Sequence, residues 1–585
     1  MPPAGRFLRV GVVLDEGDMR GWQAAALSDV ERTGVCNVTV FTRGSGDGAC
    51  TRHPVGNRFR HLRHAVRHWL YHAYEWADRR RFGGTDDALA RVSIPNGDGA
   101  THRVHLRGDW PSEAQVAAIT AEDLDVLLCL APDVPADRLA GCARAGAWSL
   151  HGGGCGEARF FWEMYDGDLV APITLRAHTP TDGERVIYRS VVGSDQISLH
   201  RFRCGGYQRA AHMPARRLRD LHDRGWPYIT SSPVYAEPCP TPEPRRSWPT
   251  NATMLRLLWR IFRGMLSGRL GRWLGEEQWF LAYRRHAPGP PADEHSAALT
   301  TIMPPAGRFY ADPFLFQHEG RRFVFFEDYE SSRGSAVICY VEIDDRGGHS
   351  APRIALRQDC HLSYPFVFAE GNAVYMLPET GGHRTVELYR AARFPVEWTL
   401  ERVLLRDVCA RDATLLRHDG RLWLFVAIDL DGGIPTDELF LFSSDSLHGE
   451  WEPHPMNPVV SDVRSARPAG RIFPESGHLI RPAQDCSRSY GGRIVFNRIE
   501  TLTPTDYSEQ PIGAIEPAPD TGNLRTHSYD SDGAYEVLDG FRTRPRVSVP
   551  VPGISRAARS PRWYRVDLEA AGRERSLLSG KLERT

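Results

Sequence analysis

The sequence predicts two domains of different class, an open α/β domain followed by an all-β domain built as a five-bladed β-propeller. In the first half, apolar strand-like runs alternate with helical patterns, which is typical of α/β folds. In the second half, a hairpin-like phrase recurs three times with constant internal spacing, as expected for propeller blades. The proline-rich stretch Glu237-Pro-Cys-Pro-Thr-Pro-Glu-Pro244 separates the halves. We therefore expect an α/β domain over 1–232, a linker and helix over 233–276, the propeller over 277–565 and a tail over 566–585.

Composition and charge exclude several classes of function. The chain has 585 residues, of which 41% are apolar and 25% charged, so it has room for two or three domains. A net charge of −1 gives no general attraction to nucleic acid. Lys581 is the only lysine, which excludes a Schiff-base lysine or a phosphate-loop lysine everywhere except the C-terminal end.

Cysteine usage and hydropathy indicate the compartment. The 11 cysteines are scattered and include no Cys-x-x-Cys pair, which argues against a zinc module and a disulfide framework. No apolar run approaches the roughly 20 residues of a membrane span, and the apolar stretch near the N-terminus is too short for a secretory signal. We expect a cytoplasmic protein.

The first half contains the elements of an α/β domain. Leu8–Leu14, Val38–Phe41 and Leu124–Leu130 are predicted strands, and a helix with Trp22, Ala26 and Val30 on one side follows the first of them. A second predicted helix, from Asn57 to Arg81, carries four histidines, of which His64 and His68 have the i, i+4 spacing of metal ligands. Aromatic residues share this helix and no cysteine lies nearby, so we interpret the histidines as a surface or packing stripe and predict no metal.

Two segments of the first half resemble the core of the formyltetrahydrofolate-dependent formyltransferases. They are Gly146-Ala-Trp-Ser149-Leu-His151-Gly-Gly-Gly154 and Thr181-Asp-Gly-Glu-Arg-Val-Ile187. The resemblance implies a working set of Asn, His and Asp, in which the imidazole and carboxylate move protons and the amide binds the oxyanion. His151 matches the histidine, Ser149 stands where asparagine is expected, and Asp182 lies one place after the expected aspartate. It thus implies a formyl- or acyltransferase acting on an amino sugar with 10-formyltetrahydrofolate, but the two departures favour a degenerate or repurposed domain.

A basic amphipathic helix is predicted after the proline-rich linker. From Met254 to Leu274, apolar residues such as Leu258 and Phe262 alternate with arginines such as Arg256 and Arg263. Such a helix can lie on an anionic bilayer or pack one domain against another with its arginines solvated. We favour packing and keep peripheral membrane contact through 254–274 as the alternative.

The repeated phrase begins at Asp312, Tyr364 and Asp412, and these starts are 52 and 48 residues apart. Each copy is an alternating apolar strand, a turn with glycine, and a second aromatic-rich strand, which is the pattern of a β-hairpin. Weaker copies begin at Arg481 and His527. Because the first strand of each blade lines the propeller axis, we expect these five residues to converge there, with Glu327 and Glu379 one strand further out.

A ring of acidic residues at the axis has a chemical consequence. Asp312, Asp412, Glu327 and Glu379 repel one another, so the pKa of some of them must rise. One protonated and one ionised carboxyl near neutral pH are what the cleavage or formation of a glycosidic bond requires. The alternative is structural, in that a blade-start aspartate can accept backbone N–H groups and fix its turn.

The second half also resembles known propeller modules. The segments that carry this resemblance are Tyr310-Ala-Asp-Pro-Phe, Ser363-Tyr-Pro-Phe, Arg411-Asp-Ala-Thr, Ala466-Arg-Pro-Ala-Gly470 and Arg481-Pro-Ala-Gln-Asp-Cys486. Together they are similar to the propeller of glycoside hydrolase family 43 and, more closely, to that of glucosamine inositolphosphorylceramide transferase-like proteins.

The resemblance implies catalytic roles. Asp312 maps onto the catalytic base of the hydrolases and Asp412 onto its partner, while the acid is Glu379, Glu475 or Glu327. The chain departs from the hydrolases at the second blade, which starts with a tyrosine.

These observations give one leading hypothesis and two alternatives. The leading one is a carbohydrate-active propeller that binds a glycosyl group and hydrolyses or transfers it without a cofactor, with Tyr364, Arg481 and His527 orienting the substrate. The second is formyl or acyl transfer through His151, Ser149 and Asp182, with the propeller as a recognition module. The third is a non-catalytic scaffold in glycolipid or natural-product assembly.

Overall fold

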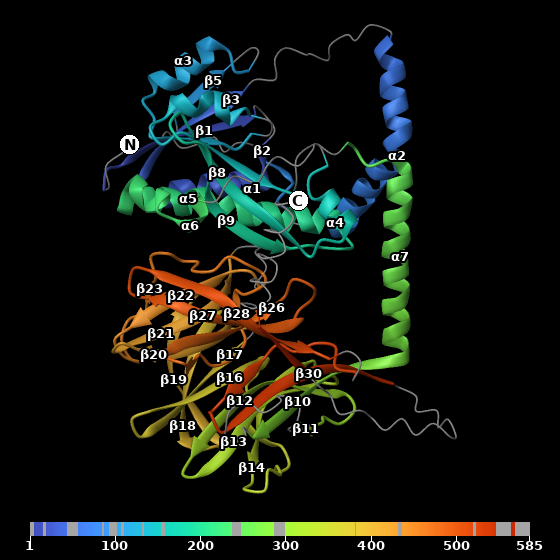
Figure 1. The fold of residues 1–585 in the computed structure, drawn as a ribbon, viewed down its shortest axis with the longest axis vertical. Helices are drawn as coiled ribbons and strands as arrows, with labels where there is room; N and C mark the ends of the chain where they lie inside the picture. Colours follow the sequence, from blue (N-terminus) through green and yellow to red (C-terminus); the bar gives the residue numbers. More distant parts are fainter. Residues whose placement is uncertain are drawn as a thin grey trace, which may run out of the picture. The chain divides into compact units, whose positions relative to one another are not determined.

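The computed structural model describes residues 5–15, 19–43, 56–84, 87–92, 102–106, 110–131, 134–153, 158–236, 247–285, 299–380, 382–430, 436–518, 522–545 and 563–567. The chain forms two compact units, Met1–Gly264 and Met265–Thr585, shown in Figure 1. Each unit is described by itself.

The N-terminal unit is built on a seven-stranded mixed sheet with the strand order β5-β3-β1-β6-β7-β8-β9. The first five strands in this order pair in parallel and the last two are antiparallel. The strands are β1 (Leu8–Asp15), β3 (Cys36–Arg43), β5 (His102–Leu106), β6 (Val126–Cys129), β7 (Ala147–Gly152), β8 (Val170–Thr179) and β9 (Gly183–Gly193), and β2 (Met19–Arg20) pairs separately with β4 (Arg91–Val92). The predicted α/β class is confirmed.

Helices cover both faces of this sheet, as the alternation of buried residues along β1 requires. Val10 and Val12 share one core with residues of α1 and α5, whereas Val13 on the opposite face joins a second core with α3 and η1. The helices of the unit are α1 (Gly21–Arg32), α2 (Gly56–Phe82), α3 (Glu113–Ala121), η1 (Ala136–Cys142), α4 (Phe161–Asp166), α5 (Leu199–Thr230) and α6 (Pro233–Ala236). At the start of α3, Ser112 and Gln115 exchange side-chain and backbone hydrogen bonds as a capping box.

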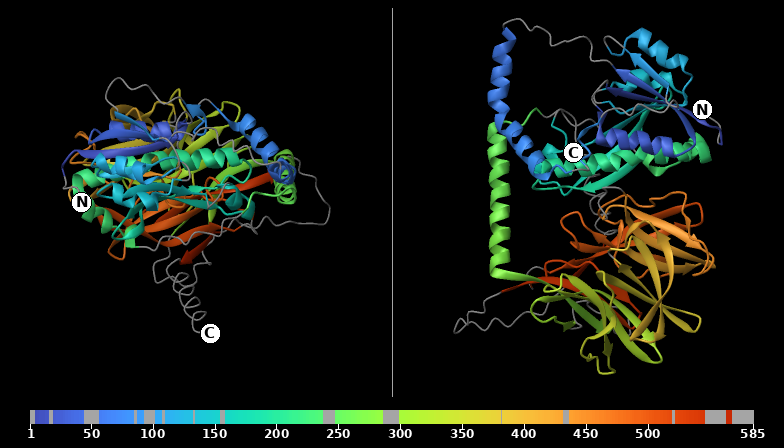
Figure 2. Two further views of the ribbon diagram at one scale, coloured as in Figure 1. Left: turned by 90° about the horizontal axis from the view of Figure 1, so that it is seen from above. Right: turned by 180° about the vertical axis from the view of Figure 1, so that it is seen from behind.

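The predicted basic helix is α7 (Asn251–Leu274), a continuous rod in Figures 1 and 2. Met254, Leu257 and Ile261 form its buried face and join the core of the N-terminal unit. His68 of α2 is buried and its Nδ1 lies 2.8 Å from the carbonyl oxygen of Pro249, so this histidine is a packing residue, as interpreted. Among the described helices, none is both long and apolar enough to cross a membrane.

The second unit is a five-bladed β-propeller, as predicted. Blade 1 consists of β12 (Arg308–His318), β13 (Arg321–Glu330), β14 (Ser335–Ile343) and β15 (Arg353–Leu356). Blade 2 consists of β16 (Leu362–Glu370), β17 (Ala373–Thr380), β18 (Thr385–Arg393) and β19 (Glu397–Arg406). Blade 3 consists of β20 (Cys409–His418), β21 (Arg421–Asp429), β22 (Leu439–Ser444) and β23 (Glu452–Pro453). Blade 4 is β24 (Arg467–Pro468) and β25 (Phe473–Glu475), both paired with β26 (His478–Asp485), then β27 (Arg493–Leu502), β28 (Tyr507–Pro517) and β31 (Trp563–Asp567).

Strands from both ends of the propeller form blade 5 and close the ring. The inner strand β29 (Tyr529–Ser531) pairs with β30 (Tyr535–Pro545), β30 pairs with β10 (Gly275–Arg285), and β10 pairs with β11 (Thr300–Ile302). Eleven residues of β10 are in register with β30. Because β10 comes from the start of the propeller and β29 and β30 come from near its end, this shared sheet closes the ring.

The repeated phrase forms the hairpins that its glycines predict. At the β12–β13 turn Glu319 and Gly320 both have positive φ, and at the β20–β21 turn Asp419 and Gly420 do as well, which is the conformation of a tight type I′ hairpin turn. The apolar faces of neighbouring hairpins pack together, so that Phe366, Leu377 and Leu424, for example, share one core.

Candidate functional site

Three inner strands carry the same irregularity at the same place. The pairing of the first and second strands shifts register between Ala311 and Phe314 in blade 1, between Ser363 and Phe366 in blade 2, and between Arg411 and Thr414 in blade 3. The residues in these bulges that have positive φ are Asp312 (52°), Tyr364 (47°) and Asp412 (53°). A bulge re-aims the side chain it carries, and a left-handed backbone at a non-glycine residue is typical of functional sites.

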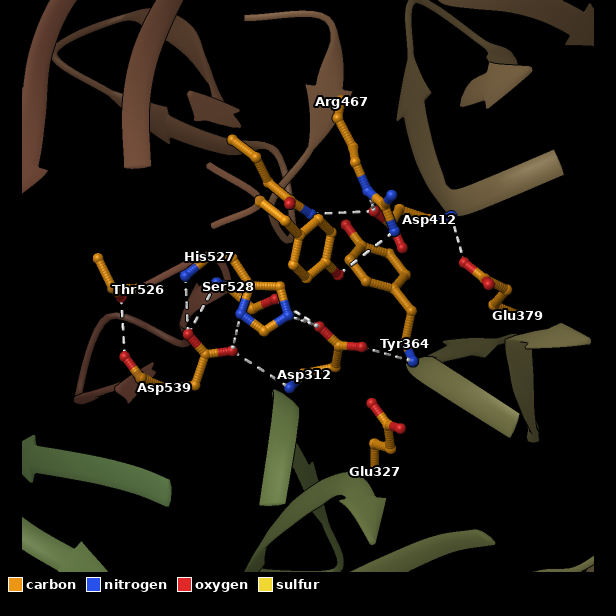
Figure 3. Close-up of polar contacts among 12 residues, drawn as sticks. Asp312, Glu327, Tyr364, Glu379, Asp412, Arg467, Thr526, His527, Ser528 and Asp539 are labelled. Atoms are coloured by element: carbon orange, nitrogen blue, oxygen red, sulfur yellow. Dashed lines mark hydrogen bonds and ion pairs between the residues drawn. The ribbon is translucent and has the colours of Figure 1, made fainter. Parts of the chain in front are cut away.

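Asp312 is buried and held by three groups from two blades. Oδ1 accepts a hydrogen bond from Ser528 Oγ at 2.6 Å and lies 3.2 Å from His527 Nε2, while Oδ2 accepts the backbone N–H of Tyr364 at 3.2 Å, as Figure 3 shows. Burial alone would raise the pKa of this carboxyl, but the charge of His527 and the hydrogen bonds of His527 and Ser528 outweigh it, and the pKa lies below its ordinary value. Asp312 is therefore an ionised carboxylate.

His527 lies between two carboxylates. Its Nδ1 is 2.7 Å from Oδ2 of Asp539, on the side away from Asp312. Burial opposes the charged imidazolium, but the two aspartates overcome this and raise the pKa of His527 to about 10. Sequence reasoning missed Asp539, which lies 12 residues after His527 in the weak copy of the repeat that begins there.

Asp412 faces the fourth blade. Its Oδ2 accepts hydrogen bonds from Arg467 Nε at 2.5 Å and from Gln484 Nε2 at 3.0 Å. Burial raises the pKa of Asp412 to about 7 against the opposing charge of Arg467. Glu379 lies on the other side, where its Oε2 accepts the N–H of Asp412 at 3.3 Å and its Oε1 accepts from Arg411 at 2.8 Å.

Glu327 is a second buried carboxyl whose pKa is strongly raised. It lies beneath Asp312 and Tyr364 in Figure 3, and its Oε1 is 3.3 Å from Nε2 of His361. Burial, together with the negative charges of Asp312, Glu379 and Asp412, holds the pKa of Glu327 well above its ordinary range. Four acidic residues from three blades thus influence one another at the axis, as expected from their places in the repeat.

Tyr364 joins two blades rather than facing solvent. It is fully buried, and its hydroxyl lies 2.8 Å from Oγ1 of Thr414. Its backbone N–H, not its side chain, contacts Asp312. The expectation that its side chain orients a substrate is therefore wrong, because the phenol ring is packed between blades 2 and 3.

The structure corrects the predicted start of blade 4. Arg481 lies on the second strand of that blade, where it is buried and makes two hydrogen bonds to Glu509 at 2.7 and 2.6 Å. The residue that reaches the axial cluster is Arg467, which follows Asp412 by 55 residues. Arg467-Pro468 repeats the residue–proline pattern of Asp312-Pro313 and Tyr364-Pro365, but so does Arg481-Pro482, and this signal alone therefore does not distinguish the two arginines.

Glu475 does not belong to the axial cluster. It is exposed at the tip of a hairpin, where it pairs with His478 across Ser476 and Gly477. Because Glu475 is exposed whereas the carboxyls of Asp312, Asp412 and Glu327 are buried, its position does not support a role as the acid of the cluster.

Aromatic rings lie over the cationic side of the cluster. The ring of Tyr490 is 4.8 Å from the guanidinium of Arg467 and 5.1 Å from the imidazole of His527, and Trp279 is 4.3 Å from the same imidazole. Tyr490 is 41% exposed, so one of these rings is open to a ligand. Gly491 allows the approach, since a Cβ on it would lie 2.9 Å from both His527 and Trp279.

Arg471 links three blades further along the axis. Its Nε donates to Asp530 Oδ1 at 3.2 Å, and its Nη2 donates to the carbonyl oxygens of Val367 at 2.9 Å and Leu315 at 3.4 Å. These carbonyls lie three residues beyond Tyr364 and Asp312 on β16 and β12. One guanidinium therefore crosses the centre of the propeller behind the carboxyl cluster.

The predicted residues of the N-terminal unit are only partly brought together. At the end of β7, Ser149 Oγ lies 2.8 Å from Nε2 of His151 and 2.8 Å from Nε2 of His178. Burial lowers the pKa of His151 to about 3, so its imidazole is neutral. Asp182 is bound instead to the hydroxyl of Tyr235 at 2.8 Å, in the turn between β8 and β9.

This arrangement does not fit the residue set that 10-formyltetrahydrofolate chemistry implies. His178 pairs with Ala147 at the start of β7, whereas His151 pairs with Thr174 near its end, so the β8–β9 turn that carries Asp182 lies well away from His151 along the strand. The hydroxyl of Ser149 is already shared by two imidazoles. The prediction that Asp182 acts with His151 is wrong.

The fold and site define a five-bladed propeller with an acidic axial cluster. A family described as glucosamine inositolphosphorylceramide transferase 1, N-terminal, matches residues 295–523. This match lies within the propeller and confirms the resemblance of that segment.

Curated relatives that match the chain carry the same name as this family. Glucosamine inositolphosphorylceramide transferase 1 of Oryza sativa subsp. japonica is 39% identical over 262 residues, which cover 42% of this chain and 35% of the relative. The protein of that name from Arabidopsis thaliana is 35% identical over 248 residues, covering 40% and 32%. The chain thus spans about a third of the length of these relatives.

Solved structures were also matched. The catalytic domain of the family 62 α-L-arabinofuranosidase of Coprinopsis cinerea is 15% identical, with 49% of this chain and 97% of that chain covered and a TM-score of 0.32. Zg3597, a family 117 glycoside hydrolase of Zobellia galactanivorans, is 11% identical, with 47% and 93% covered and a TM-score of 0.29.

Proposed function

We propose that the propeller binds a glycosyl-containing substrate over the axial cluster and cleaves or transfers the glycosyl group, with Asp312 as the base and Glu327 as the acid. The observation that carries this proposal is the opposite displacement of two neighbouring pKa values. The pKa of Asp312 is lowered and that of Glu327 is raised well above its ordinary range. Paired carboxyls whose pKa values are pushed apart are the usual acid and base of glycosidic bond chemistry.

The neighbouring residues support these roles without sharing them. Asp412 is engaged by Arg467 and Gln484, and Glu379 by Arg411, so both act by raising the pKa of Glu327. His527 keeps Asp312 ionised. His361 is 37% exposed and lies against Glu327, which gives the buried acid a route for exchanging protons with solvent.

The substrate class follows from the exposed ring and from the relatives. Tyr490 offers an open aromatic face backed by Arg467, and such faces stack on the apolar side of sugar rings. The matched relatives are named as transferases of glucosamine and inositolphosphorylceramide. On this ground an amino sugar or a glycolipid headgroup is the first substrate to try.

The test is a turnover screen with matched variants. Wild-type protein, Asp312→Asn, Glu327→Gln and Glu475→Gln would be assayed with aryl glycosides and with nucleotide-linked amino sugars. We expect the first two variants to lose turnover and Glu475→Gln, an exposed glutamate, to keep it. If Asp312→Asn keeps full turnover, or if sugars bind without turnover in the wild type, the propeller is a recognition module and the catalytic proposal fails.

Acyl transfer in the N-terminal unit is a second candidate, supported by the Ser149, His151 and His178 cluster. His151 Nε2 lies 2.8 Å from the Ser149 hydroxyl, within reach of its proton, although burial makes this imidazole a weaker base than an ordinary histidine. Glucosamine and an acyl thioester would be the probes. Loss of transfer in both His151→Ala and Ser149→Ala supports this function, whereas transfer that survives both variants excludes it.

Peripheral membrane contact is proposed for α7. Beside its buried face, the part of α7 in the N-terminal unit carries a second apolar stripe of Leu255, Trp259 and Phe262, each 53–60% exposed. At about 100° per residue these positions fall within roughly 60° of one another on the helix. The helix has arginines and no acidic residue, so an anionic bilayer complements both its charge and its apolar stripe.

Vesicle binding tests this contact. We expect the protein to sediment with vesicles rich in phosphatidylserine and not with phosphatidylcholine vesicles. Trp259→Ser with Phe262→Ser would abolish sedimentation, while Leu400→Ser, an equally exposed residue on β19, would not. Equal sedimentation of the double variant and wild type would exclude α7 as the contact.

A further inference from the structure

A cluster of one aspartate, one histidine and one cysteine in the N-terminal unit has no part in the functions proposed above. His200 and Cys204 are one turn apart near the start of α5, and Asp87 comes from the segment before β4. Asp87 and Cys204 are 117 residues apart in sequence. Sequence spacing therefore could not show that these three side chains meet.

The three donor atoms form a nearly equilateral triangle. His200 Nε2 lies 3.3 Å from Asp87 Oδ1 and 3.5 Å from Cys204 Sγ, and Cys204 Sγ lies 3.4 Å from the same Asp87 oxygen. Bonds of about 2.0 Å to N and O and about 2.3 Å to S in a tetrahedral site place ligand atoms about 3.3–3.6 Å apart. All three distances match this spacing. The imidazole–carboxylate distance of 3.3 Å is longer than the 2.7–2.9 Å usual for a charge-assisted hydrogen bond.

Burial and charge also suit a divalent ion. The side chains of His200 and Asp87 are 6% and 7% exposed, and Cys204 is partly buried. A carboxylate and a thiolate with a neutral imidazole carry two negative charges, which a divalent ion balances. Three protein ligands leave a fourth position for water or another ligand.

The backbone that holds the three residues is well anchored. Ser198 caps the N-terminus of α5 by accepting from the N–H of Arg201, and the N–H of His200 donates to Asp78 of α2 at 2.7 Å. Arg79 approaches Oδ2 of Asp87 at 3.5 Å, the oxygen that does not face His200 and Cys204. Its Oδ1 faces His200 and Cys204 and also accepts the backbone N–H of Leu89 at 2.9 Å.

Other clusters of ligand-type residues are occupied by their own partners. In the group of His151, His178 and Glu184, the Ser149 hydroxyl lies between the two imidazoles and Arg176 holds the glutamate. In the axial group, the two nitrogens of His527 face separate aspartates. A surface group of Asp359, Cys360 and His383 has the same donor types, but Nδ1 of His383 faces Glu387 at 2.9 Å and Asp359 is 91% exposed. Within the described residues, the triangle of Asp87, His200 and Cys204 therefore combines this donor set with burial and with the spacing that zinc prefers.

We propose that Asp87, His200 and Cys204 bind one zinc ion in the N-terminal unit. This differs from the expectation of no metal, which rested on the histidines of α2 and on the absence of paired cysteines. The site is independent of the axial cluster, so its failure would leave the proposed glycosyl chemistry untouched.

The first test measures zinc in the full-length protein. Protein stripped with a chelator would be titrated with zinc in competition with a chromophoric chelator, and metal content would be measured by elemental analysis. We expect one ion per chain, and a loss of affinity in His200→Ala and Cys204→Ser greater than the 10–100-fold typical of changes to residues that only support the ligands. Cys360→Ser, in a surface cluster of the propeller with Asp359 and His383, is the control and would keep full binding.

A second test identifies the thiolate ligand by its spectrum. Cobalt bound in place of zinc would show a thiolate-to-metal charge-transfer band in the wild type that is absent in Cys204→Ser. This variant keeps a hydroxyl near Asp87, so circular dichroism would confirm that it folds. The proposal is overturned if stripped protein binds no zinc, if the cobalt band persists in Cys204→Ser, or if chelator leaves the melting temperature of zinc-loaded protein unchanged.

Discussion

Arg467 donates a hydrogen bond from Nε to Oδ2 of Asp412 at 2.5 Å, and both side chains are buried where blades 3 and 4 meet at the axis. We predict that Arg467→Met lowers the free energy of unfolding by about 3–5 kcal/mol, because it leaves Asp412 buried beside other acidic residues without its cation. Urea denaturation monitored by tryptophan fluorescence would measure this. Arg464→Met is the control, since Arg464 pairs with Asp462 at the surface, and it should cost less than about 1 kcal/mol. Equal effects of both variants would contradict the prediction.

The acid role of Glu327 predicts a particular pH profile. Because its pKa is raised well above the ordinary range, turnover should persist to a higher pH than an ordinary glutamic acid would allow, and it should fall as pH rises through that pKa. Glu327→Gln should lower kcat by about 10²–10⁴, and its residual activity should lack this alkaline decline. A variant that keeps the same alkaline decline would show that another group is the acid.

The charge of His527 predicts how stability depends on pH. Its folded pKa is about 10, above the ordinary 6.5, so the folded protein binds more protons than the unfolded chain between these values. The stability that this contributes is complete below about pH 6.5 and is lost as pH rises toward 10. His527→Gln should show a flatter decline in unfolding free energy across this window, measured by urea denaturation at several pH values. An unchanged slope would contradict the assignment of the charge to His527.

The open ring of Tyr490 predicts a loss of sugar affinity on truncation. Aromatic contacts of this kind are worth about 0.5–1.5 kcal/mol, so Tyr490→Ala should weaken the binding of a glycosyl ligand up to about tenfold. Tyr490→Phe keeps the ring over Arg467 and should bind as the wild type does. Calorimetric titration of both variants decides between stacking and a role of the hydroxyl.

The parts of the propeller that sequence predicted correctly are those where local pattern and fold agree. In blades 1 to 3, alternating apolar residues and a turn glycine sit at fixed distances, so strand identity and the axial places of Asp312, Tyr364 and Asp412 followed from the spacing. The constant spacing within the repeat also placed Glu327 and Glu379 on the second strand of their blades, where they lie.

Blade 4 was misassigned because its inner strand is broken. It consists of two short pieces, β24 and β25, with Gly470 between them at φ 141° against the backbone of Tyr529. No alternating apolar run marks this strand. Because β26 has a stronger apolar pattern, Arg481 on β26 was predicted as the start of the blade. Proximity in three dimensions, not local sequence, decides that Arg467 reaches Asp412.

In the N-terminal unit, the sequence identified two residues of the site but not the residues that contact them. Ser149 and His151 were identified from the resemblance of one short segment to the formyltransferases, but the hydrogen-bonding partner of Ser149 on the next strand is His178, whose position depends on the register of β7 and β8. Asp182 was chosen for its nearness in sequence to an expected position, and the β8–β9 turn carries it elsewhere.

The position of Arg471 bears on how a substrate would reach the axial cluster. Its guanidinium contacts β12, β16 and Asp530 and so bridges the inner strands of three blades at the axis. In the proposed function, a substrate would therefore reach and leave the carboxyl cluster on one side of the ring, which suits a terminal sugar or a compact headgroup better than the interior of a long polysaccharide.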